Sequence, residues 1–364
     1  MRPYHRLFEE ARPGGDDVTS KCLDEDVVSR LLEARLSDQE ASTVRAHLAT
    51  CASCAELIGE VVRVTDGSPV SSAFEEIGIL GRRQGELIGD RWRLAHWIGA
   101  GRMGSVWEVE DVLGEHPPRA VKLIRENDEG RARLRREAKL LMHLEHPNVV
   151  RAFDWYETIS GGALILERLH GETLDLRIRR GGPIAFEDAI RILRAVARGL
   201  AHAHASGVAH RDLKPSNVFL TSDPVRVVLV DLGLAAPTAE WAEATLTRLT
   251  EEGASVGTPI YMAPEQLFGE RMDERVDLWA LGLLAHEVVC GSLPFEVGPL
   301  GKLLRALRRA PFPPLSVRAN VPSSSLDGAV QKWLSFEPSA RGETADAAAL
   351  LDALARSRNL PEPW

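Results

Sequence analysis

The feature that most constrains the fold is a glycine-rich segment set between two strand-like runs. The segment GAGRMGSV carries glycines at Gly99, Gly101 and Gly104 and ends at Val106. The runs on either side, RWRLAHWI and WEVED, alternate in short stretches and predict a β-hairpin. A dinucleotide-binding glycine motif would instead lead from a strand into a helix. The strand–turn–strand context therefore disfavours a dinucleotide-binding fold.

Beyond this hairpin the pattern changes from strand-like to helical. Further strands are expected in PRAVKLIRE, VVRAFDWYE and GALILERL, with a helix in EGRARLRREAKLLMHLEH. After Gly182 the pattern is helical, in FEDAIRILRAVARGLAHAHASG, VDLWALGLLAHEVVCG and TADAAALLDALARSR. This order predicts an α+β fold of two lobes, with a β-rich N-lobe followed by a helical C-lobe.

Composition narrows the class of protein. The chain has 364 residues, 44% of them hydrophobic, and a net charge of -9, which disfavours a nucleic-acid binder. The most apolar stretch, LWALGLLAHEVVC, is too short to span a bilayer and contains His286 and Glu287. The N-terminus lacks the apolar core of a signal peptide. We therefore expect a cytoplasmic chain, no membrane partner, and reduced cysteines.

Four further motifs follow the glycine-rich segment in a fixed order. AVKL places Lys122 in a strand, HRDLKPSN covers residues 210–217, DLG begins at Asp231, and GTPIYMAPE ends at Glu265. The order and spacing of this set resemble those of protein kinases. Residues 90 to about 357 are similar to a bacterial serine/threonine protein kinase of the eukaryotic type.

The resemblance implies catalytic roles for four residues. Lys122 would supply a cation for the α- and β-phosphates of ATP, with Glu137 as its partner carboxylate. The alternative for Glu137 is a surface carboxylate beside arginines. Asp212 would orient or deprotonate the substrate hydroxyl, and Lys214 would lie near the transferred phosphate. Asn217 and Asp231 would supply the oxygen ligands that Mg2+ (or Mn2+) prefers.

The resemblance also implies an apolar pocket for adenine, with Leu166 as gatekeeper and Glu167 and Leu169 in the hinge. The apolar residues among these could equally be ordinary core residues. The full set of expected ATP contacts is Ile98, Gly99, Ala100, Gly101, Gly104, Val106, Ala120, Lys122, Leu166, Glu167, Leu169 and Phe219.

Three more residues resemble structural positions of the family. Asp277 would brace the catalytic loop, and Glu265 and Arg341 would form a buried ion pair. His202 and His204 could be taken for metal ligands, but their spacing puts them on different faces of a helix. We therefore expect these two histidines to pack within the fold.

The expected activity is transfer of the γ-phosphate of ATP to serine and threonine hydroxyls of proteins, including the chain itself. A small-molecule phosphotransferase is disfavoured because a recognisable activation segment runs from Asp231 to Glu265. The resemblance favours Thr250 as a phosphorylation site in that segment, with Thr247 next. The alternative functions are a pseudokinase-like scaffold or an anti-sigma-type binding protein. The alternative for the activation segment is a polar loop that never carries phosphate.

The N-terminal region contains HLATCASC, in which His47, Cys51 and Cys54 share one helix face. Zinc takes four tetrahedral ligands, and Cys22 is the remaining cysteine nearby. This spacing resembles the zinc-binding domain of anti-sigma factors, which implies a sigma factor or another protein as partner. A redox pair formed by Cys51 and Cys54, or ordinary buried thiols, are the alternatives.

The expected domain organisation follows from these segments. We predict a disordered N-terminus at 1–19, a helical zinc-binding domain at 20–65, a linker at 66–89, the kinase-like domain at 90–357 and a short tail at 358–364. A capping-box signature, Ser37 with Glu40, opens the second helix of the zinc-binding domain. Phosphorylation between copies would allow a transient homodimer.

Overall fold

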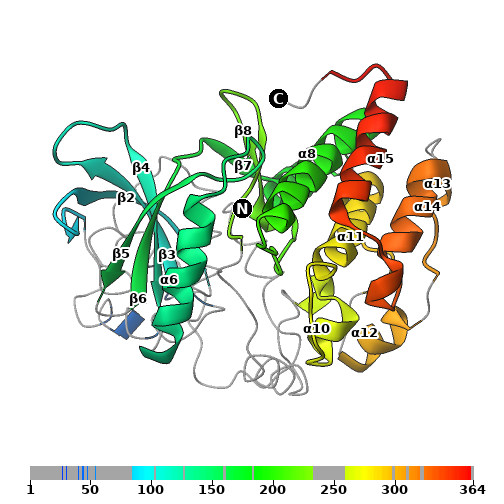
Figure 1. Cartoon of the computed structure of the whole chain (residues 1–364), viewed down its shortest axis with the longest axis horizontal. Helices are drawn as coiled ribbons and strands as arrows, with labels where there is room; N and C mark the ends of the chain where they lie inside the picture. The colour runs from blue at the N-terminus through cyan, green and yellow to red at the C-terminus, as the bar shows by residue number, and fades with distance from the viewer. Residues whose placement is uncertain are drawn as a thin grey trace. The chain divides into compact units, whose positions relative to one another are not determined.

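The computed structural model describes most of the chain from residue 84 onward and divides it into two compact units (Figure 1). The sheet-rich unit comprises Met1–Lys139 and Ala152–Arg168, and the helical unit comprises Leu140–Arg151 and Leu169–Trp364. The described residues are 84–101, 104–125, 128–158, 161–182, 184–232, 259–296, 300–308, 311–319 and 324–361, with Val27, Arg30, Glu40, Thr43, Val44, His47 and Cys54.

The sheet-rich unit is built on one antiparallel sheet with the strand order β1-β2-β3-β4-β6-β5. The helix α6, Asp128–Met142, lies in the chain between β4 and β5. The strands are β1 (Leu87–Ile88), β2 (Trp92–Gly101), β3 (Gly104–Asp111), β4 (Arg119–Arg125), β5 (Ala152–Thr158) and β6 (Gly161–Leu166). The hairpin, the later strands and the helix predicted from the sequence are all present. The sheet begins at Leu87, within the stretch predicted as a linker.

Tryptophans form much of the core of this unit. Trp107 on β3 is fully buried and is the cross-strand partner of Trp97 on β2. The indole N–H of Trp107 donates to Ser105 Oγ at 3.1 Å, so its polar atom is satisfied inside the core. Alternate residues of β3 are buried, because successive side chains of a strand point to opposite faces.

Among its described residues, the helical unit carries three long helices and a small sheet. The long helices are α8 (Phe186–Ala205), α11 (Val276–Cys290) and α15 (Thr344–Ser357), which are the three helices predicted from the sequence. The small sheet has the order β7-β8-β9, with β7 at Gly171–Thr173, β8 at Val218–Thr221 and β9 at Val227–Leu229. Shorter helices are α7 (Leu174–Gly181), α10 (Pro264–Leu267), α12 (Leu300–Leu307), α13 (Leu315–Ala319) and α14 (Ser324–Trp333).

The helix α15 packs along α8, as Figure 1 shows, and the contact includes a buried ion pair. Arg194 on α8 is 1% exposed and donates through Nε to Asp352 Oδ1 at 2.6 Å. Arg198, one turn further along α8, donates to the same oxygen at 2.9 Å. This shared carboxylate fixes the last long helix to the helix that leads into the catalytic loop.

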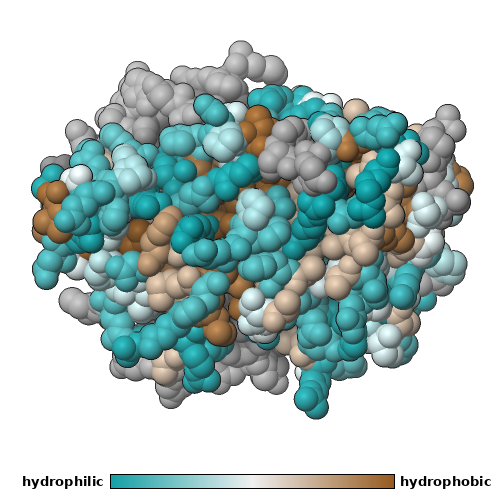
Figure 2. All heavy atoms as spheres, turned by 45° about the horizontal axis from the view of Figure 1, so that its top comes forward, coloured by the Kyte–Doolittle hydropathy of each residue, from teal (hydrophilic) through white to brown (hydrophobic). Residues whose placement is uncertain are grey.

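The view in Figure 2 shows a mainly hydrophilic surface, with hydrophobic residues exposed in small, separate areas. Apolar residues gather in the interior instead, as in the helix α11, where nearly all side chains are buried. Among the described residues, no helix combines the length and the apolar character needed to cross a membrane.

Candidate active site

In the sheet-rich unit, strand register brings several of the expected ATP contacts to one face of the sheet. Val106 on β3 pairs with Lys122 on β4, and Ala120 pairs with Leu166 on β6. Directly opposed residues of antiparallel strands project to the same face, as do residues two apart on one strand. Val106, Ala120, Lys122 and Leu166 therefore share a face, although their sequence positions span 61 residues.

Gly99 and Gly104 of the glycine-rich hairpin are glycines for different physical reasons. At Gly104, which has φ +150°, a Cβ would lie 1.7 Å from the carbonyl oxygen of Leu123, so the hairpin itself requires glycine. At Gly99, paired with Val106, a Cβ would meet nothing within 4 Å. Gly99 therefore leaves open space beside the backbone, the kind of opening that lets a ligand approach closely. Ile98, Ala100 and Gly101 belong to the same strand, β2.

Lys122 lies on β4 with only 4% of its surface exposed. A buried ammonium group is costly unless a negative group is close to it. Glu137, the partner expected from the sequence, lies on α6 in the same unit, and its Oε2 atom is buried. The roles of both residues stay predictions.

The remaining expected ATP contacts lie around the end of β6 and on β8. Leu166 is the last residue of β6 and is half-buried, as is Glu167 after it. Leu169, which belongs to the helical unit, is buried, and Phe219 on β8 is half-buried. Phe219 pairs with Thr173 on one side and Val228 on the other.

In the helical unit, three of the predicted catalytic and metal-binding residues form one hydrogen-bonded group. Lys214 Nζ lies 3.1 Å from Asp212 Oδ2. Asn217 Nδ2 donates to the same carboxylate oxygen at 3.1 Å and to the backbone carbonyl of Asp212 at 2.8 Å. Asn217 is held in turn by its backbone carbonyl, which accepts from Val230 N at 3.0 Å, directly before Asp231. One ammonium group and one amide N–H thus converge on the same carboxylate oxygen.

Two residues beside this group have an uncommon backbone conformation. Arg211 has φ +64° and Asp231 has φ +65°, both in the left-handed region that residues other than glycine rarely adopt. Such strain persists where surrounding contacts impose it, and it is found most often at functional sites. Arg211 directly precedes Asp212, and Asp231 is itself a predicted magnesium ligand.

Asp277 on α11 supports the loop that carries Asp212. Its two carboxylate oxygens accept the backbone N–H groups of His210 and Arg211, each at 2.7 Å. Burial works to raise the pKa of this carboxyl, but hydrogen bonding and charge from His204, together with His210, outweigh it and the pKa is lowered. Asp277 is therefore ionised in the fold. The predicted bracing role of Asp277 is confirmed.

A second buried support connects the end of the activation segment to the region before α15. Arg341 is 1% exposed and pairs with Glu265, with Nη2 donating to Oε2 at 2.8 Å. The predicted ion pair is therefore confirmed. Arg341 also donates to the backbone carbonyls of Ser335 and Phe336.

The family model described as the protein kinase domain matches residues 92–347. The chain belongs to this family. The match covers both units, from β2 to the first turn of α15.

Several curated relatives of this kinase-family chain are named serine/threonine-protein kinases. It is 33% identical over 273 residues to the serine/threonine-protein kinase PknH of Mycobacterium bovis, covering 74% of this chain and 44% of PknH. It is 34% identical over 264 residues to PknE of Mycobacterium tuberculosis, covering 71% and 45%. For pkn2 of Myxococcus xanthus the identity is 34% over 284 residues, covering 75% and 33%. The chain thus spans less than half the length of these relatives.

A solved structure agrees on the fold. The crystal structure of Rad53 1-466 in complex with AMP-PNP matches with a TM-score of 0.58 and 25% sequence identity. The match covers 71% of this chain and 64% of the Rad53 chain. The sheet-rich and helical units of this kinase-family chain are therefore those of the protein kinase fold.

Several predicted sites lie outside the described residues. Cys22 and Cys51 of the predicted zinc site, and the predicted phosphorylation sites Thr247 and Thr250, are among them. His47 and Cys54 are described, and both have helical backbone. Neither site is tested by the geometry.

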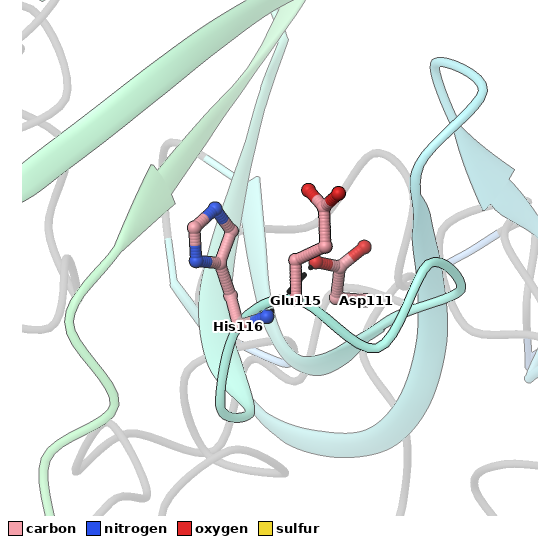
Figure 3. A group of neighbouring side chains, drawn as sticks. All are labelled: Asp111, Glu115 and His116. Atoms are coloured by element: carbon pink, nitrogen blue, oxygen red, sulfur yellow. Dashed lines mark hydrogen bonds between the residues drawn. The ribbon is translucent and has the colours of Figure 1, made fainter.

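Figure 3 shows one further group of polar side chains, Asp111, Glu115 and His116, at the turn after β3. The backbone N–H of His116 donates to Asp111 Oδ2 at 3.1 Å. Arg91 Nη2 lies 2.9 Å from Asp111 Oδ2 and 2.6 Å from Glu115 Oε2. The Arg91 guanidinium holds the pKa of Asp111 at about 2. Because Arg91 already pairs with both carboxylates, we assign this group to packing of the turn and not to metal binding.

The sequence reasoning missed one supporting residue of the catalytic loop. Gln266, which follows Glu265 on α10, is buried, and its Nε2 donates to the backbone carbonyl of Arg211 at 3.0 Å. Its Oε1 accepts from the backbone N–H of Ala263 at 2.9 Å. A buried amide in a four-residue helix has no periodic signal in the sequence, so only its position after the GTPIYMAPE motif could have indicated it.

Proposed function

We propose that this chain is a serine/threonine protein kinase, which transfers the γ-phosphate of ATP to hydroxyls of proteins, itself included. The observation that carries the proposal is the group formed by Asp212, Lys214 and Asn217 beside the strained Asp231. The relatives named serine/threonine-protein kinases support the same activity. The substrates are protein hydroxyls that reach the catalytic loop.

Asp212 orients the substrate hydroxyl and accepts its proton. Lys214 and Asn217 both contact Oδ2 of Asp212. Among the described residues, Oδ1 has no hydrogen-bond partner, so it is available to a hydroxyl. Fixing one carboxylate oxygen orients the other, which is the geometric requirement for a general base. The Lys214 ammonium group then lies next to the reacting oxygen, where it can stabilise negative charge on the phosphoryl group.

The residues present fit an ATP–magnesium complex. Asn217 uses its Nδ2 on Asp212, which leaves its amide oxygen as a ligand, and Asp231 adds a carboxylate. Oxygen donors of these kinds suit Mg2+, which neutralises phosphate charge when bound. Lys122 supplies a further cation, with Glu137 as the carboxylate that orients it, and the open space at Gly99 suits close approach of phosphates.

Nucleotide binding separates this proposal from its alternative, a pseudokinase-like scaffold. Full-length protein should bind Mg-ATP in calorimetry and phosphorylate an added protein substrate. Lys122→Met should weaken binding, and Asp212→Asn should keep binding but lose transfer, because Asp212 acts on the hydroxyl and not on the nucleotide. Wild-type protein that binds Mg-ATP and transfers nothing would establish the scaffold.

We further propose that the activation segment is phosphorylated, at Thr250 first and at Thr247 next. Arg211 supports this, because it is half-buried beside Asp212 and has no acidic partner among the described residues. Arginine is well suited to pair with a phosphate. Peptide mass spectrometry should find phosphate at these threonines, and Thr250→Ala should lower activity more than Thr245→Ala. Full activity without phosphate at any of the three would reject the proposal.

A zinc ion held by Cys22, His47, Cys51 and Cys54 is our proposal for the N-terminal part. Arg30 lies in the segment LDEDVVSRLLEARL, whose apolar repeat predicts a first helix. It donates to Glu40 in the second predicted helix at 2.7 Å, which supports a helical hairpin. Cys54 and Val44 of the second helix are buried. Three ligands from one helix face and one from elsewhere match the tetrahedral preference of zinc.

Metal analysis of full-length protein purified without chelators tests the zinc proposal. We expect about one zinc ion per chain, and weaker binding in Cys22→Ala, because the fourth ligand is lost. Ser20→Ala, two residues away, serves as the matched control. Zinc-free protein, or unchanged affinity in Cys22→Ala, would leave the redox-pair or buried-thiol alternatives.

The partners follow as proposals of the same kind. The N-terminal part would bind a sigma factor or another protein, since that is what the anti-sigma resemblance implies. Transfer between two copies would form a transient homodimer. A cytoplasmic setting would supply ATP and keep the cysteines reduced.

A further inference from the structure

A chain of buried hydrogen bonds runs from the last long helix to the catalytic loop, entirely within the helical unit. Thr344 Oγ1, on the first residue of α15, lies 2.9 Å from His204 Nδ1 on α8. His204 Nε2 lies 2.7 Å from Asp277 Oδ2 on α11. Asp277 accepts the backbone N–H groups of His210 and Arg211. Three helices thus meet in one polar line that ends beside Asp212.

The histidine in the middle of this chain can serve both neighbours in only one tautomer when it is neutral. Asp277 is ionised and can only accept hydrogen bonds, so His204 must present Nε2–H to it. A neutral imidazole carries one N–H, which leaves Nδ1 as an acceptor. Thr344 must then donate its hydroxyl proton to Nδ1. In the opposite tautomer, the lone pair of Nε2 would face the carboxylate.

Thr344 has no competing role in the helix that it begins. The N-cap of α15 is Glu343, and no side chain caps the helix. Thr344 is only 4% exposed, so its hydroxyl is removed from water, and its side-chain hydrogen bond is the one to His204. Burying a hydroxyl is favourable only where it is hydrogen-bonded. Its position is therefore explained by the contact with His204.

We propose that Thr344 is a positioning residue for phosphoryl transfer. Its hydroxyl donates to Nδ1 and fixes the orientation in which the His204 ring presents Nε2–H to Asp277, and the Asp277 carboxylate in turn imposes the left-handed conformation of Arg211. The strained φ of +64° at Arg211 needs such support, and it sets the direction in which the chain continues to Asp212. The effect of Thr344 on catalysis rests on the kinase activity proposed above, whereas its hydrogen bond to His204 does not.

The test compares Thr344→Val, which keeps the shape and removes the hydroxyl, with Thr344→Ser, which keeps the hydroxyl. Full-length protein labelled with 15N-histidine reports the signals of both ring nitrogens by NMR, and the His204 signals are assigned by their absence in His204→Gln. We expect Nε2 to keep its proton in all three proteins, because Asp277 can only accept a hydrogen bond. The Nδ1 signal should be that of a hydrogen-bonded acceptor in wild type and Thr344→Ser, and should shift to that of an unbonded nitrogen in Thr344→Val. If Thr344→Val does not fold, Thr344→Ala removes the hydroxyl without adding an apolar branch and takes its place.

Steady-state kinetics provide the second measurement. Removing a group that orients a catalytic element commonly costs about tenfold or more in activity, so kcat of Thr344→Val should fall by about that factor. KM for ATP should change little, because no ATP contact is touched, and Thr344→Ser should restore kcat. An unchanged Nδ1 signal of His204 in Thr344→Val overturns the proposal, as does Thr344→Ser with a defect equal to that of Thr344→Val. If wild type transfers no phosphate, the proposed function has failed, and the Nδ1 signal still decides whether Thr344 holds His204.

Discussion

At the scale of single residues, two neighbours on α11 have pKa values shifted in opposite directions. His286 is fully buried, and burial first, with the charge of Arg318 next, lowers its pKa from 6.5 to about 4. Glu287 is the next residue, and burial, with the charge of Asp175, raises its pKa from 4.5 to about 7. Both groups therefore favour their neutral forms inside the fold.

His286 should make the protein less stable in acid. The unfolded state binds a proton below pH 6.5, whereas the folded state does so only near pH 4, so stability falls as pH falls through this interval. At pH 5 the loss through this one group is about 2 kcal/mol. His286→Phe should remove that part of the acid-side slope, measured as the free energy of unfolding in urea at pH 5 and pH 8. An unchanged slope in this variant would show that the imidazole is not buried as a neutral group.

Glu287 should act in the other direction. The unfolded carboxyl ionises above pH 4.5, whereas the folded one resists ionisation until about pH 7, so stability falls as pH rises through this range. At pH 8 the cost is about 3 kcal/mol as an upper figure. Glu287→Gln should therefore stabilise the protein at pH 8 and have little effect at pH 4.5. Asp188→Asn, on an exposed position of α8, is the control. Equal effects of Glu287→Gln at both pH values would contradict the shifted pKa.

At the scale of elements, the glycine-rich hairpin contains one glycine that the fold requires and one that we expect ligand binding to require. A Cβ at Gly104 would clash with the Leu123 carbonyl, whereas one at Gly99 would meet nothing. Gly104→Ala should therefore lower the melting temperature. Gly99→Ala should leave it unchanged and weaken ATP binding, because a methyl group fills the space beside the backbone. Calorimetry with Mg-ATP and thermal unfolding measure both effects. Normal ATP affinity in Gly99→Ala would remove this glycine from the nucleotide site.

The ion pair between Glu265 and Arg341 should be a main support of the helical unit. Removing one partner of a buried pair leaves an uncompensated charge and typically costs about 3–5 kcal/mol. Arg341→Met should therefore reduce the free energy of unfolding by about that amount. Arg275→Met is the control, because the Arg275–Asp273 pair lies nearer the surface. Similar losses in the two variants would indicate that burial of the pair is not what stabilises it.

The elements that the sequence predicted share length and a clear period. The strands β2 to β6 and the helices α6, α8, α11 and α15 all carry an apolar repeat over seven or more residues or a strand-like run between breakers. The strands β7 to β9 and the helix α10 have only three or four residues, too few for a repeat to be visible. Their formation depends on partners elsewhere in the chain, such as the pairing of β8 with both β7 and β9.

The candidate site was likewise predictable from the sequence only in part. The residues of the motifs could be named from their order, since each motif has its own local pattern. The contacts that hold them could not, because they join positions far apart. Asp277 acts on a loop 66 residues before it, and Thr344 acts on His204 across 140 residues. Only the packing of three helices brings these groups together.

At the scale of the whole molecule, the chain combines a sheet-rich unit, a helical unit and an N-terminal part with a predicted zinc site. The predicted catalytic residues fall in both units, with Lys122 on the sheet and Asp212 in the helical unit. Each unit supports its own residues through internal contacts. We propose that residues of both units act in the transfer of phosphate to protein hydroxyls.

Transfer of labelled phosphate from γ-labelled ATP, with Mg2+, to the full-length protein tests this claim most directly. The labelled protein is hydrolysed, and the labelled amino acids are identified. We expect label on serine and threonine in the wild-type protein, and a loss of orders of magnitude in Asp212→Asn, because the group that orients the hydroxyl is gone. Label that appears equally in Asp212→Asn, or no label on the wild-type protein, would contradict it.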